Sequence, residues 1–289
     1  MKTRDKFDLV VLDMDGTIYG RQFSGGFSPR VRRAIAAVQS AGTPVTIATG
    51  RIFDFVRKVA PDLGITLPVI TAQGAVIGDP VSGELLYEAL IPPEAARSAA
   101  RWADSEDRTT VFYLNQPGGR TRLVQNFSPA ASGTGGLEGW DTATYDHWFG
   151  SPREPCPSLL EVMNEAGVRP LKFITVNDFK QEADLTAHLQ TRFGSDLLIS
   201  RSHQLLVEGT APTANKGDAL KLLAGRLNVD LARVLAVGDN ENDIPMMRAA
   251  GFAVAMGQAT AVVQREADWV APALAQDGAA VALERLLLP

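Results

Sequence analysis

Residues 9–17 read Leu-Val-Val-Leu-Asp-Met-Asp-Gly-Thr, an apolar run that ends in two carboxylates and a glycine. Four consecutive apolar residues predict a strand buried on both faces, which is typical of a parallel sheet. Ligands bind at the carboxyl edge of such a sheet, so Asp13 and Asp15 lie where a site would form. On an extended chain, side chains two residues apart point the same way. The pair can hold a hard cation such as Mg²⁺ or act as nucleophile and proton shuttle, although Asp-Gly can also be a simple turn signal.

The first third of the chain alternates between strand-like and helix-like patterns. Strands are predicted at 7–12, 44–48 and 68–71, with helices at 29–41 and 52–60. The last third repeats this order, with strands at 234–237, 252–255 and 268–270 and helices ending at 227, 250, 266 and 287. A strand-helix-strand order of this kind predicts a parallel sheet with right-handed crossovers.

The middle of the chain has a different pattern. Longer alternating strands are predicted at 110–114, 121–126, 171–176 and 196–207, with helices at 93–104 and 181–193. A stretch rich in Gly, Ser and Ala at 128–139 predicts a loop. We therefore expect an α/β core made of residues 1–82 and 208–289, interrupted by an inserted α+β cap domain at residues 83–207.

Composition narrows the possible functions. The 289 residues carry a formal charge of −5, which argues against a nucleic-acid partner or an anionic membrane surface. Cys156 is the only cysteine, so an intrachain disulfide and a multi-cysteine metal site are both excluded. No apolar stretch reaches 18 residues. We expect a soluble, cytoplasmic protein without a membrane partner; the oligomeric state is left open.

Two further segments place anion-binding groups at helix starts. Thr49, Gly50 and Arg51 follow the second predicted strand, where a hydroxyl and backbone N–H groups can bind an anion. The alternative is that Thr49 only caps the helix. Lys216 lies in the first turn of a predicted helix, where the helix dipole disfavours a cation. That position hints at a function for the lysine, against the simpler interpretation of a solvated side chain.

Acidic and amide side chains also gather after the predicted strand at 234–237, as Asp239, Asn240, Asn242 and Asp243. Asp243 can cap the next helix, but a cap does not explain Asp239. One sheet edge can bring all these segments into a single crevice. Carboxylates, a hydroxyl with backbone donors and a lysine are together suited to a phosphate and a divalent metal.

The four segments resemble, in order, the motifs of the haloacid dehalogenase-like superfamily. They match DxDGT at 13–17, the threonine motif at 49–51, the lysine motif at Lys216 and GDxxND at 238–243. The insert resembles the α/β cap of the Cof-like hydrolases. The resemblance implies a Rossmann-like parallel-sheet core and a Mg²⁺-dependent phosphatase. Its substrates would be small phosphorylated metabolites, such as sugar phosphates or a phosphorylated cofactor.

The resemblance also implies a role for each residue. Asp13 would attack phosphorus and form an aspartyl-phosphate, and Asp15 would protonate the leaving alcohol and then activate water. The phosphate would be bound by Thr49, Gly50, Arg51, Lys216 and Asn242. The metal would be held by Asp13, Asp15 through its backbone carbonyl, Asp239 and, in support, Asp243. Gln73 departs from the family pattern, since many relatives have Asn-Gly-Ala where this chain has Gln-Gly-Ala at 73–75.

Two alternatives to hydrolysis stay open. The same aspartyl-phosphate could serve a phosphotransferase or mutase, because the outcome depends on whether water is excluded. The second alternative is a module that binds phosphate without catalytic activity. Aromatic residues at 140–149 are expected to form cap core rather than a substrate surface. The cap is expected to open and close over the crevice, with hinges near Ser82 and Glu208.

Overall fold

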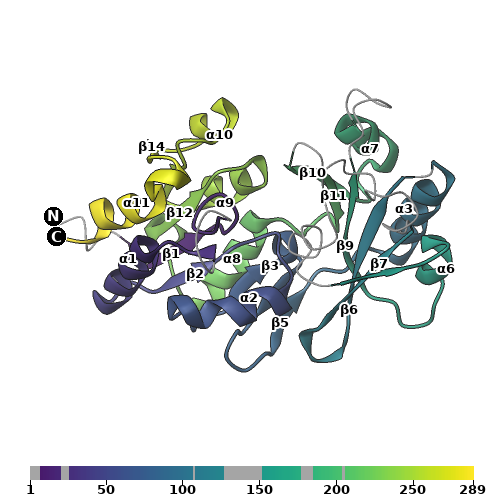
Figure 1. Cartoon of the computed structure of the whole chain (residues 1–289), viewed down its shortest axis with the longest axis horizontal. Coiled ribbons are helices and arrows are strands. Elements are labelled where there is room, and N and C mark those ends of the chain that lie inside the picture. Colours follow the sequence, from purple (N-terminus) through teal and green to yellow (C-terminus); the bar gives the residue numbers. More distant parts are fainter. Residues whose placement is uncertain (1–6, 21–25, 107, 127–151, 177–184, 204–205) are drawn as a thin grey trace.

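The fold is seen in a computed structural model that describes residues 7–20, 26–106, 108–126, 152–176, 185–203 and 206–289. Figure 1 shows two parts lying next to each other, the core with both chain ends and the inserted cap. The core sheet is parallel throughout and has the order β14-β13-β12-β1-β2. Its strands are β1 (Leu9–Leu12), β2 (Val45–Ile47), β12 (Val234–Gly238), β13 (Phe252–Ala255) and β14 (Trp269–Val270).

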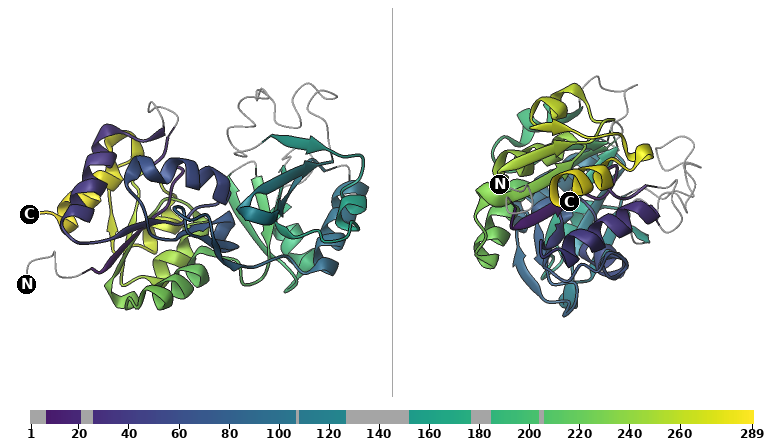
Figure 2. Two further views of the ribbon diagram at one scale, coloured as in Figure 1. Left: turned by 90° about the horizontal axis from the view of Figure 1, so that it is seen from below. Right: turned by 90° about the vertical axis from the view of Figure 1, so that its left-hand side faces the viewer.

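Helices cover both faces of this sheet, as Figure 2 shows. Val10 and Leu12 pack with α1 (Pro29–Ser40) and α11 (Gly278–Leu287). Leu9 and Val11 face the other way, toward α8 (Lys216–Leu227) and α9 (Ile244–Ala249). Because β1 is apolar on both sides, it fits the centre of a doubly covered sheet. The predicted α/β core is confirmed.

Local signals set the helix starts. Ser28 caps α1 by accepting a hydrogen bond from the Val31 N–H at 3.1 Å, and Pro29 occupies the first turn. Asn215 caps α8 in the same way, accepting from the Asp218 N–H at 2.8 Å. Two further short helices of the core are α2 (Phe53–Val59) and α10 (Ala261–Arg265).

The cap is built on a separate mixed sheet with the order β10-β11-β9-β6-β7-β8. Its strands are β6 (Thr110–Asn115), β7 (Thr121–Gln125), β8 (Arg153–Pro155), β9 (Pro170–Val176), β10 (Leu198–His203) and β11 (Leu206–Thr210). One face packs on α3 (Pro93–Ser105), α6 (Leu159–Met163) and α7 (Leu185–Phe193). Residues on the opposite face, among them Tyr113 and Ile174, join the hydrophobic cluster of the core. The cap sheet therefore presents one face to the core.

Two sequence predictions are wrong in detail. Residues 196–207 were expected to form one strand, but β10 and β11 form an antiparallel pair there. The polar residues between two apolar runs suit a single alternating strand, and no Gly or Pro marks the change of direction. The third predicted strand is present as β3 (Val69–Thr71), but it is joined to the core sheet by a single parallel bridge between Ala48 and Ile70 and not by a ladder. Its ladder is with β4 (Val76–Gly78), which pairs with β5 (Leu85–Glu88).

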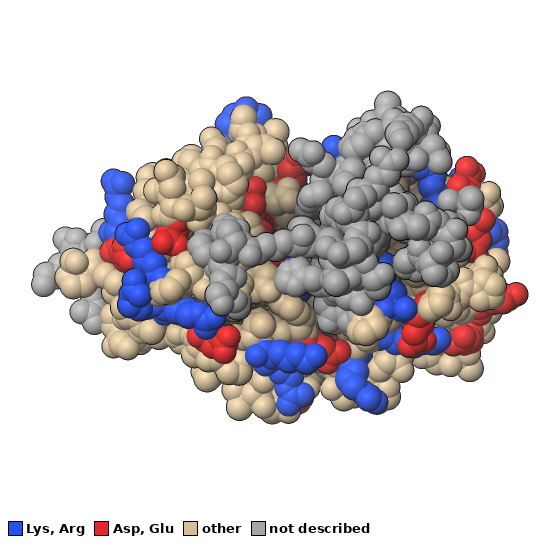
Figure 3. Space-filling view, in the orientation of Figure 1, with Lys and Arg blue, Asp and Glu red and all other residues tan. Residues whose placement is uncertain are grey.

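Several other expectations concern the chain as a whole. β11 belongs to the cap sheet and contains Glu208, and the boundaries at 82/83 and 207/208 stay a prediction. The predicted loop at 128–139 and the aromatic residues Trp140, Tyr145, Trp148 and Phe149 lie outside the described residues. Among the described helices, none combines the length and apolar character needed to cross a bilayer. On the face in Figure 3, basic and acidic side chains of the described residues are interspersed.

Candidate active site

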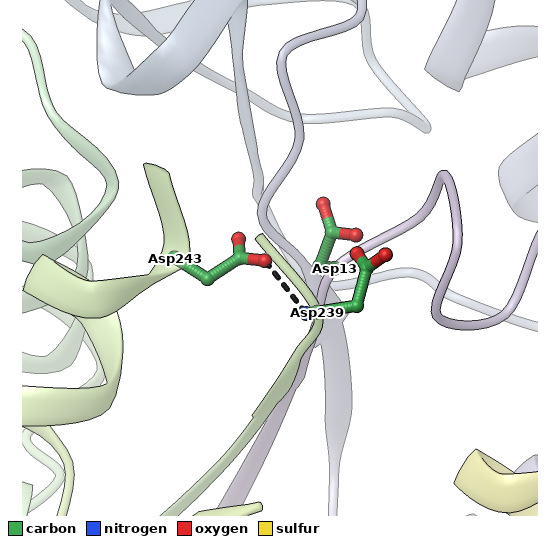
Figure 4. Close-up of side chains that lie close together, drawn as sticks. All are labelled: Asp13, Asp239 and Asp243. Carbon is green, nitrogen blue, oxygen red and sulfur yellow. Dashed lines mark hydrogen bonds between the residues drawn. The ribbon is translucent and has the colours of Figure 1, made fainter. Parts of the chain in front are cut away.

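Neighbouring strands bring three carboxylates together at the carboxyl edge of the core sheet. Asp13 directly follows β1, and Asp239 directly follows β12, its partner in the sheet. Asp243 reaches the same point from the turn before α9 (Figure 4). One carboxylate oxygen from each of the three lies within 4.8 Å of the others. The three carboxylates are close enough together to hold a metal ion, at the sheet edge where the strand-end pattern predicts a site.

Lys216 is buried against this cluster. It is the first residue of α8, and its side chain is 1% exposed. Lys216 Nζ lies 2.6 Å from Asp13 Oδ1 and 2.5 Å from Asp243 Oδ1. The unfavourable position of a cation at a helix start is therefore offset by two carboxylates. The interpretation of Lys216 as a solvated side chain is wrong.

The charges at the cluster do not balance. Burial, then the negative charges of Asp243 and Asp239, hold the pKa of Asp13 well above its ordinary value, against the effect of Lys216. Burial and Asp243 likewise raise the pKa of Asp239 to about 7. Burial opposes the charged form of Lys216, but Asp13 and Asp243 outweigh it and raise the pKa of Lys216. The cluster thus holds more negative charge than Lys216 can neutralise.

Both oxygens of Asp243 are engaged within the protein. Oδ2 accepts hydrogen bonds from the backbone N–H groups of Asp239 and Asn240, at 2.9 and 3.0 Å. Oδ1 contacts Lys216. Asp243 therefore fixes the loop that carries Asp239, and the Asp239 carboxylate remains directed toward Asp13 (Figure 4).

Asp15 is held by a buried arginine. Arg51 Nη2 and Nε donate to the two carboxylate oxygens of Asp15 at 2.6 and 2.8 Å, a forked geometry that fixes both groups. The Arg51 guanidinium also lies 4.8 Å from the ring centre of Phe55 and 5.8 Å from that of Tyr19. Burial works against the charged arginine, but Asp15 outweighs it and raises the pKa of Arg51. The side chain of Asp15 is thus positioned, while a third of it stays exposed to the pocket.

The loop after β2 is tightly packed. Thr49 is buried, and its hydroxyl accepts a hydrogen bond from the Arg51 N–H at 3.1 Å. A Cβ on Gly50 would lie 2.6 Å from Gln73 Nε2, so a larger residue here would displace the Gln73 side chain. Ile52, and not Thr49, is the N-cap residue of α2, and it makes no side-chain cap bond, so the interpretation of Thr49 as only a helix cap is wrong. Thr49 instead lines the pocket.

Gly16 allows the chain to turn beneath Asp239. Its φ of +88° favours glycine, and an added Cβ would lie 2.2 Å from Asp239 Oδ2. Gln258 joins the same place by donating to the Gly16 carbonyl at 2.6 Å and to Asp239 Oδ2 at 3.3 Å. The close contact between Gly16 and Asp239 links the first motif to the fourth.

A cavity of about 90 Å³ lies over these residues, between the core and the cap. The cap lines it with Tyr113, Lys172, Ile174, Leu206 and Glu208. Burial and the nearby Glu208 carboxylate raise the pKa of Tyr113 well above its ordinary value. Burial also lowers the pKa of Lys172, against the effect of Glu208. The pocket thus combines the charged edge of the core sheet with a partly apolar roof.

All the predicted site residues meet around this pocket, namely Asp13, Asp15, Thr49, Gly50, Arg51, Lys216, Asp239, Asn242 and Asp243. Three further residues at the site were not predicted from the sequence: Lys172, Glu208 and Gln258. Gln258 follows β13, so the rule that found Asp13 could have found it. Lys172 and Glu208 sit in alternating strands, where a charged residue normally indicates a solvent-facing side.

The donor set fits a hard divalent cation. Carboxylate and carbonyl oxygens are the ligands that Mg²⁺ prefers, and Mg²⁺ takes few of them from a protein. Asp13 and Asp239 each have a carboxylate oxygen that Lys216 does not contact. The excess negative charge of the cluster also favours a cation there. Both carboxylate oxygens of Asp15 accept hydrogen bonds from Arg51, so the Asp15 side chain is not part of this cluster.

Comparison with known proteins agrees with this geometry. A model of the haloacid dehalogenase-like hydrolase family matches residues 10–283. Phosphatase YwpJ of Bacillus subtilis (strain 168) is 30% identical over 96% of this chain and 99% of its own. 5-amino-6-(5-phospho-D-ribitylamino)uracil phosphatase YwtE of the same organism is 26% identical over 96% and 97%. The structure of a haloacid dehalogenase-like hydrolase from B. subtilis superposes with a TM-score of 0.80, at 26% identity over 97% and 100% of the two chains.

Proposed function

Because the chain belongs to the haloacid dehalogenase-like hydrolase family, we propose that it is a phosphatase that hydrolyses small phosphate monoesters. The observation that carries this proposal is the buried contact of Lys216 with Asp13 beside Asp239. A nucleophilic carboxylate at the end of a strand has a lysine on one side and a cation-binding group on the other. Phosphoryl transfer depends mainly on positioning and charge neutralisation, and this arrangement supplies both.

In the first half of the reaction, Asp13 attacks phosphorus and the phosphorus–oxygen bond to the alcohol breaks. Asp15 enters this step as the carboxylic acid and gives that proton to the departing alkoxide, so that it leaves the step as a carboxylate, while an aspartyl-phosphate forms on Asp13. Arg51 supports this step because its two N–H groups hold the Asp15 carboxyl in one orientation. In the second half, Asp15 takes a proton from water, and the resulting attack on phosphorus releases phosphate and regenerates Asp13.

The phosphoryl oxygens are bound by the Thr49 hydroxyl, the backbone of Gly50 and Arg51, the Lys216 ammonium and the Asn242 amide. Thr49, Gly50, Arg51 and Asn242 line one pocket, and Lys216 contacts Asp13 at its edge. Lys216 also favours the ionised form of Asp13 needed for attack, because its charge and hydrogen bond oppose the burial and the Asp243 charge that raise the pKa of Asp13.

The cation that fits this cluster is Mg²⁺, which Asp13, Asp239 and the backbone carbonyl of Asp15 would hold. When bound, it neutralises charge on the phosphate and on the carboxylates. Asp243 supports the site by fixing the Asp239 loop and contacting Lys216.

The substrate is a small phosphorylated metabolite. YwpJ and YwtE are named as phosphatases, and the name of YwtE gives a phosphorylated ribitylamino-uracil as its substrate. The small cavity and its partly apolar roof of Tyr113, Ile174 and Leu206 suit a compact organic alcohol as the leaving group.

A panel of phosphate monoesters, assayed for phosphate release with and without Mg²⁺, tests the proposal. We expect Mg²⁺-dependent release, and a loss of at least about a thousandfold in kcat for Asp13→Asn, because the nucleophile is removed. Retained activity in that variant would overturn the mechanism. Transfer of labelled phosphate to an acceptor sugar, with little free phosphate, would instead identify a phosphotransferase.

A further inference from the structure

A chain of hydrogen bonds runs from the core motifs into the cap. Asn242 Nδ2 donates to Gln73 Oε1 at 2.9 Å, and Gln73 Nε2 donates to Glu208 Oε1 at 3.1 Å. Lys172 Nζ donates to Glu208 Oε2 at 2.6 Å and to the Gly50 carbonyl at 2.9 Å. Gln73, Glu208 and Lys172 are buried, and all five residues line the pocket.

Glu208 determines the direction of every bond in this chain. A carboxylate only accepts hydrogen bonds, so Gln73 must turn its nitrogen toward Glu208. The oxygen of Gln73 then points to Asn242, which must offer its own nitrogen. Asn242 Oδ1 is left buried and without a hydrogen-bond partner among the described residues, an arrangement the amide would avoid if it were free to turn.

We propose that Gln73 and Glu208 are positioning residues that fix the Asn242 amide with its nitrogen toward the phosphate pocket. This inference rests on the proposed phosphatase function, in which Asn242 binds a phosphoryl oxygen. An amide nitrogen carries two N–H donors, so one remains for the phosphate after Gln73 has taken the other. The opposite orientation would present an oxygen to an anion.

The backbone around Gln73 is adapted to this position. Gln73 has a φ of +61°, a conformation that only a few per cent of non-glycine residues adopt. Its side chain fills the space beside Gly50, where a Cβ would collide with Gln73 Nε2. The Gln73 side chain thereby joins Asn242 of the core to Glu208 of the cap sheet. This gives a function to the residue at which the chain departs from the Asn-Gly-Ala pattern of many relatives.

This chain of hydrogen bonds from Asn242 through Gln73 to Glu208, the relay, also depends on where the cap lies. Glu208 and Lys172 belong to β11 and β9 of the cap sheet, while Gln73, Asn242 and Gly50 belong to the core. A cap that moves away removes the acceptor that orients Gln73. The phosphate site is therefore complete only when the cap sheet lies over the core.

Calorimetric titration of the Mg²⁺-loaded protein with inorganic phosphate tests the relay without relying on turnover. In Glu208→Gln, position 208 is no longer acceptor-only, and we expect about tenfold weaker phosphate binding, the size of one lost charge-assisted hydrogen bond. Gln73→Met keeps the length of the side chain but removes both bonds, and we expect a similar loss. Glu154→Gln, at an exposed ion pair of the same cap sheet, is the matched control and should bind phosphate like the wild type.

The double variant K172M/E208Q distinguishes a role in orienting the Asn242 amide from a role in the stability of the fold. It removes both charges of the buried pair, so a purely structural role predicts that thermal stability and phosphate affinity are both restored. The relay predicts that stability recovers while phosphate binding stays weak. Wild-type affinity in the double variant or in Gln73→Met, or no phosphate binding by the wild type, would overturn the inference. Normal phosphate binding without phosphate release from any ester would overturn only the phosphatase proposal.

Discussion

The carboxylates of the active site oppose folding unless a cation is present. Asp13, Asp239 and Asp243 lie within one small volume, and Lys216 supplies a single positive charge. Ionising a buried carboxylate beside another costs free energy, which appears as the raised pKa of Asp13 and of Asp239. Residues that make the site reactive are therefore residues that destabilise the metal-free protein.

Asp239 gives this effect a pH dependence. Its pKa is raised to about 7 in the folded protein, so between about pH 4 and 7 the folded state binds more protons than the unfolded state. We expect the melting temperature of the protein in EDTA to fall as the pH rises through this window. Mg²⁺ favours the ionised form, so the stabilisation it gives should grow from pH 5 to pH 7.5. Thermal unfolding at each pH, in EDTA and in Mg²⁺, measures the melting temperature and the stabilisation by Mg²⁺. A stabilisation by Mg²⁺ that is constant with pH would contradict the prediction.

Gly16 provides a test of how closely the metal ligand is held. Gly16→Ala places a methyl group 2.2 Å from Asp239 Oδ2, so the carboxylate must move. We expect Mg²⁺ affinity to fall by about tenfold or more.

Gly42→Ala is the control for Gly16→Ala. Gly42 has a φ of +95° but no atom within 4 Å of an added Cβ. It should lose about 1–2 kcal/mol of stability from backbone strain and keep its Mg²⁺ affinity. Titration of both variants with Mg²⁺, followed by unfolding, distinguishes the two effects; equal Mg²⁺ affinities would refute the close contact.

At the scale of elements, the site depends on how α8 approaches α9. A Cβ on Gly217 would lie 2.3 Å from the Pro245 carbonyl oxygen, so these helices meet through a glycine. Gly217 is adjacent to Lys216, and Pro245 follows Asp243 by two residues. The distance between the two helices therefore sets the distance between the lysine and its carboxylates.

Two alanine substitutions in α8 test this contact. Gly217→Ala forces the helices apart, and we expect a loss of about 1–3 kcal/mol in stability and a ten- to roughly hundredfold lower kcat. Gly225→Ala lies in the same helix with nothing near the added methyl group. It should stabilise the protein by about 0.5–1 kcal/mol and leave kcat unchanged. Urea unfolding and steady-state kinetics check both, and equal effects of the two would rule out the contact.

Much of the core site could be predicted from the sequence because its residues obey one positional rule. Asp13 and Asp239 follow apolar strands, and Lys216 begins a helix, so their convergence follows from a parallel sheet. Lys172 and Glu208 carry no such signal. Each of these two charged residues stands next to apolar residues in its strand. This sequence pattern is the same whether the charged side of the strand is covered by another domain or exposed to water. Only the packing of the cap sheet over the core decides between them.

At the scale of the molecule, a hydrogen bond also joins the cap to the core outside the pocket. The Asp54 carboxylate, in the first turn of α2, accepts a hydrogen bond from the Thr121 N–H of β7 at 2.7 Å. This bond joins the two parts directly. Together with the contact of Lys172 on Gly50, it favours the arrangement in which the cap lies over the crevice.

Asp54→Ala removes the hydrogen bond with the Thr121 N–H and should favour an open cap. We expect a larger radius of gyration in small-angle scattering without phosphate, a return toward the wild-type value with phosphate and Mg²⁺, and a KM raised severalfold. Asp62→Ala, which removes an exposed carboxylate paired with Arg32 in the core, is the control and should change neither. A single cap angle in every condition would exclude cap movement.

The position of β1 at the centre of the core sheet has a consequence for biosynthesis. β1 lies between β2 and β12, yet β12 is translated only after the whole cap. A ribosome that has passed Thr210 has made every strand of the cap sheet, while β1 still presents an unpaired apolar edge. Such an edge is a template for association with other chains. The strands of the cap sheet are therefore all synthesised before the core sheet can be completed, and during that interval the edge of β1 is open to association with other chains.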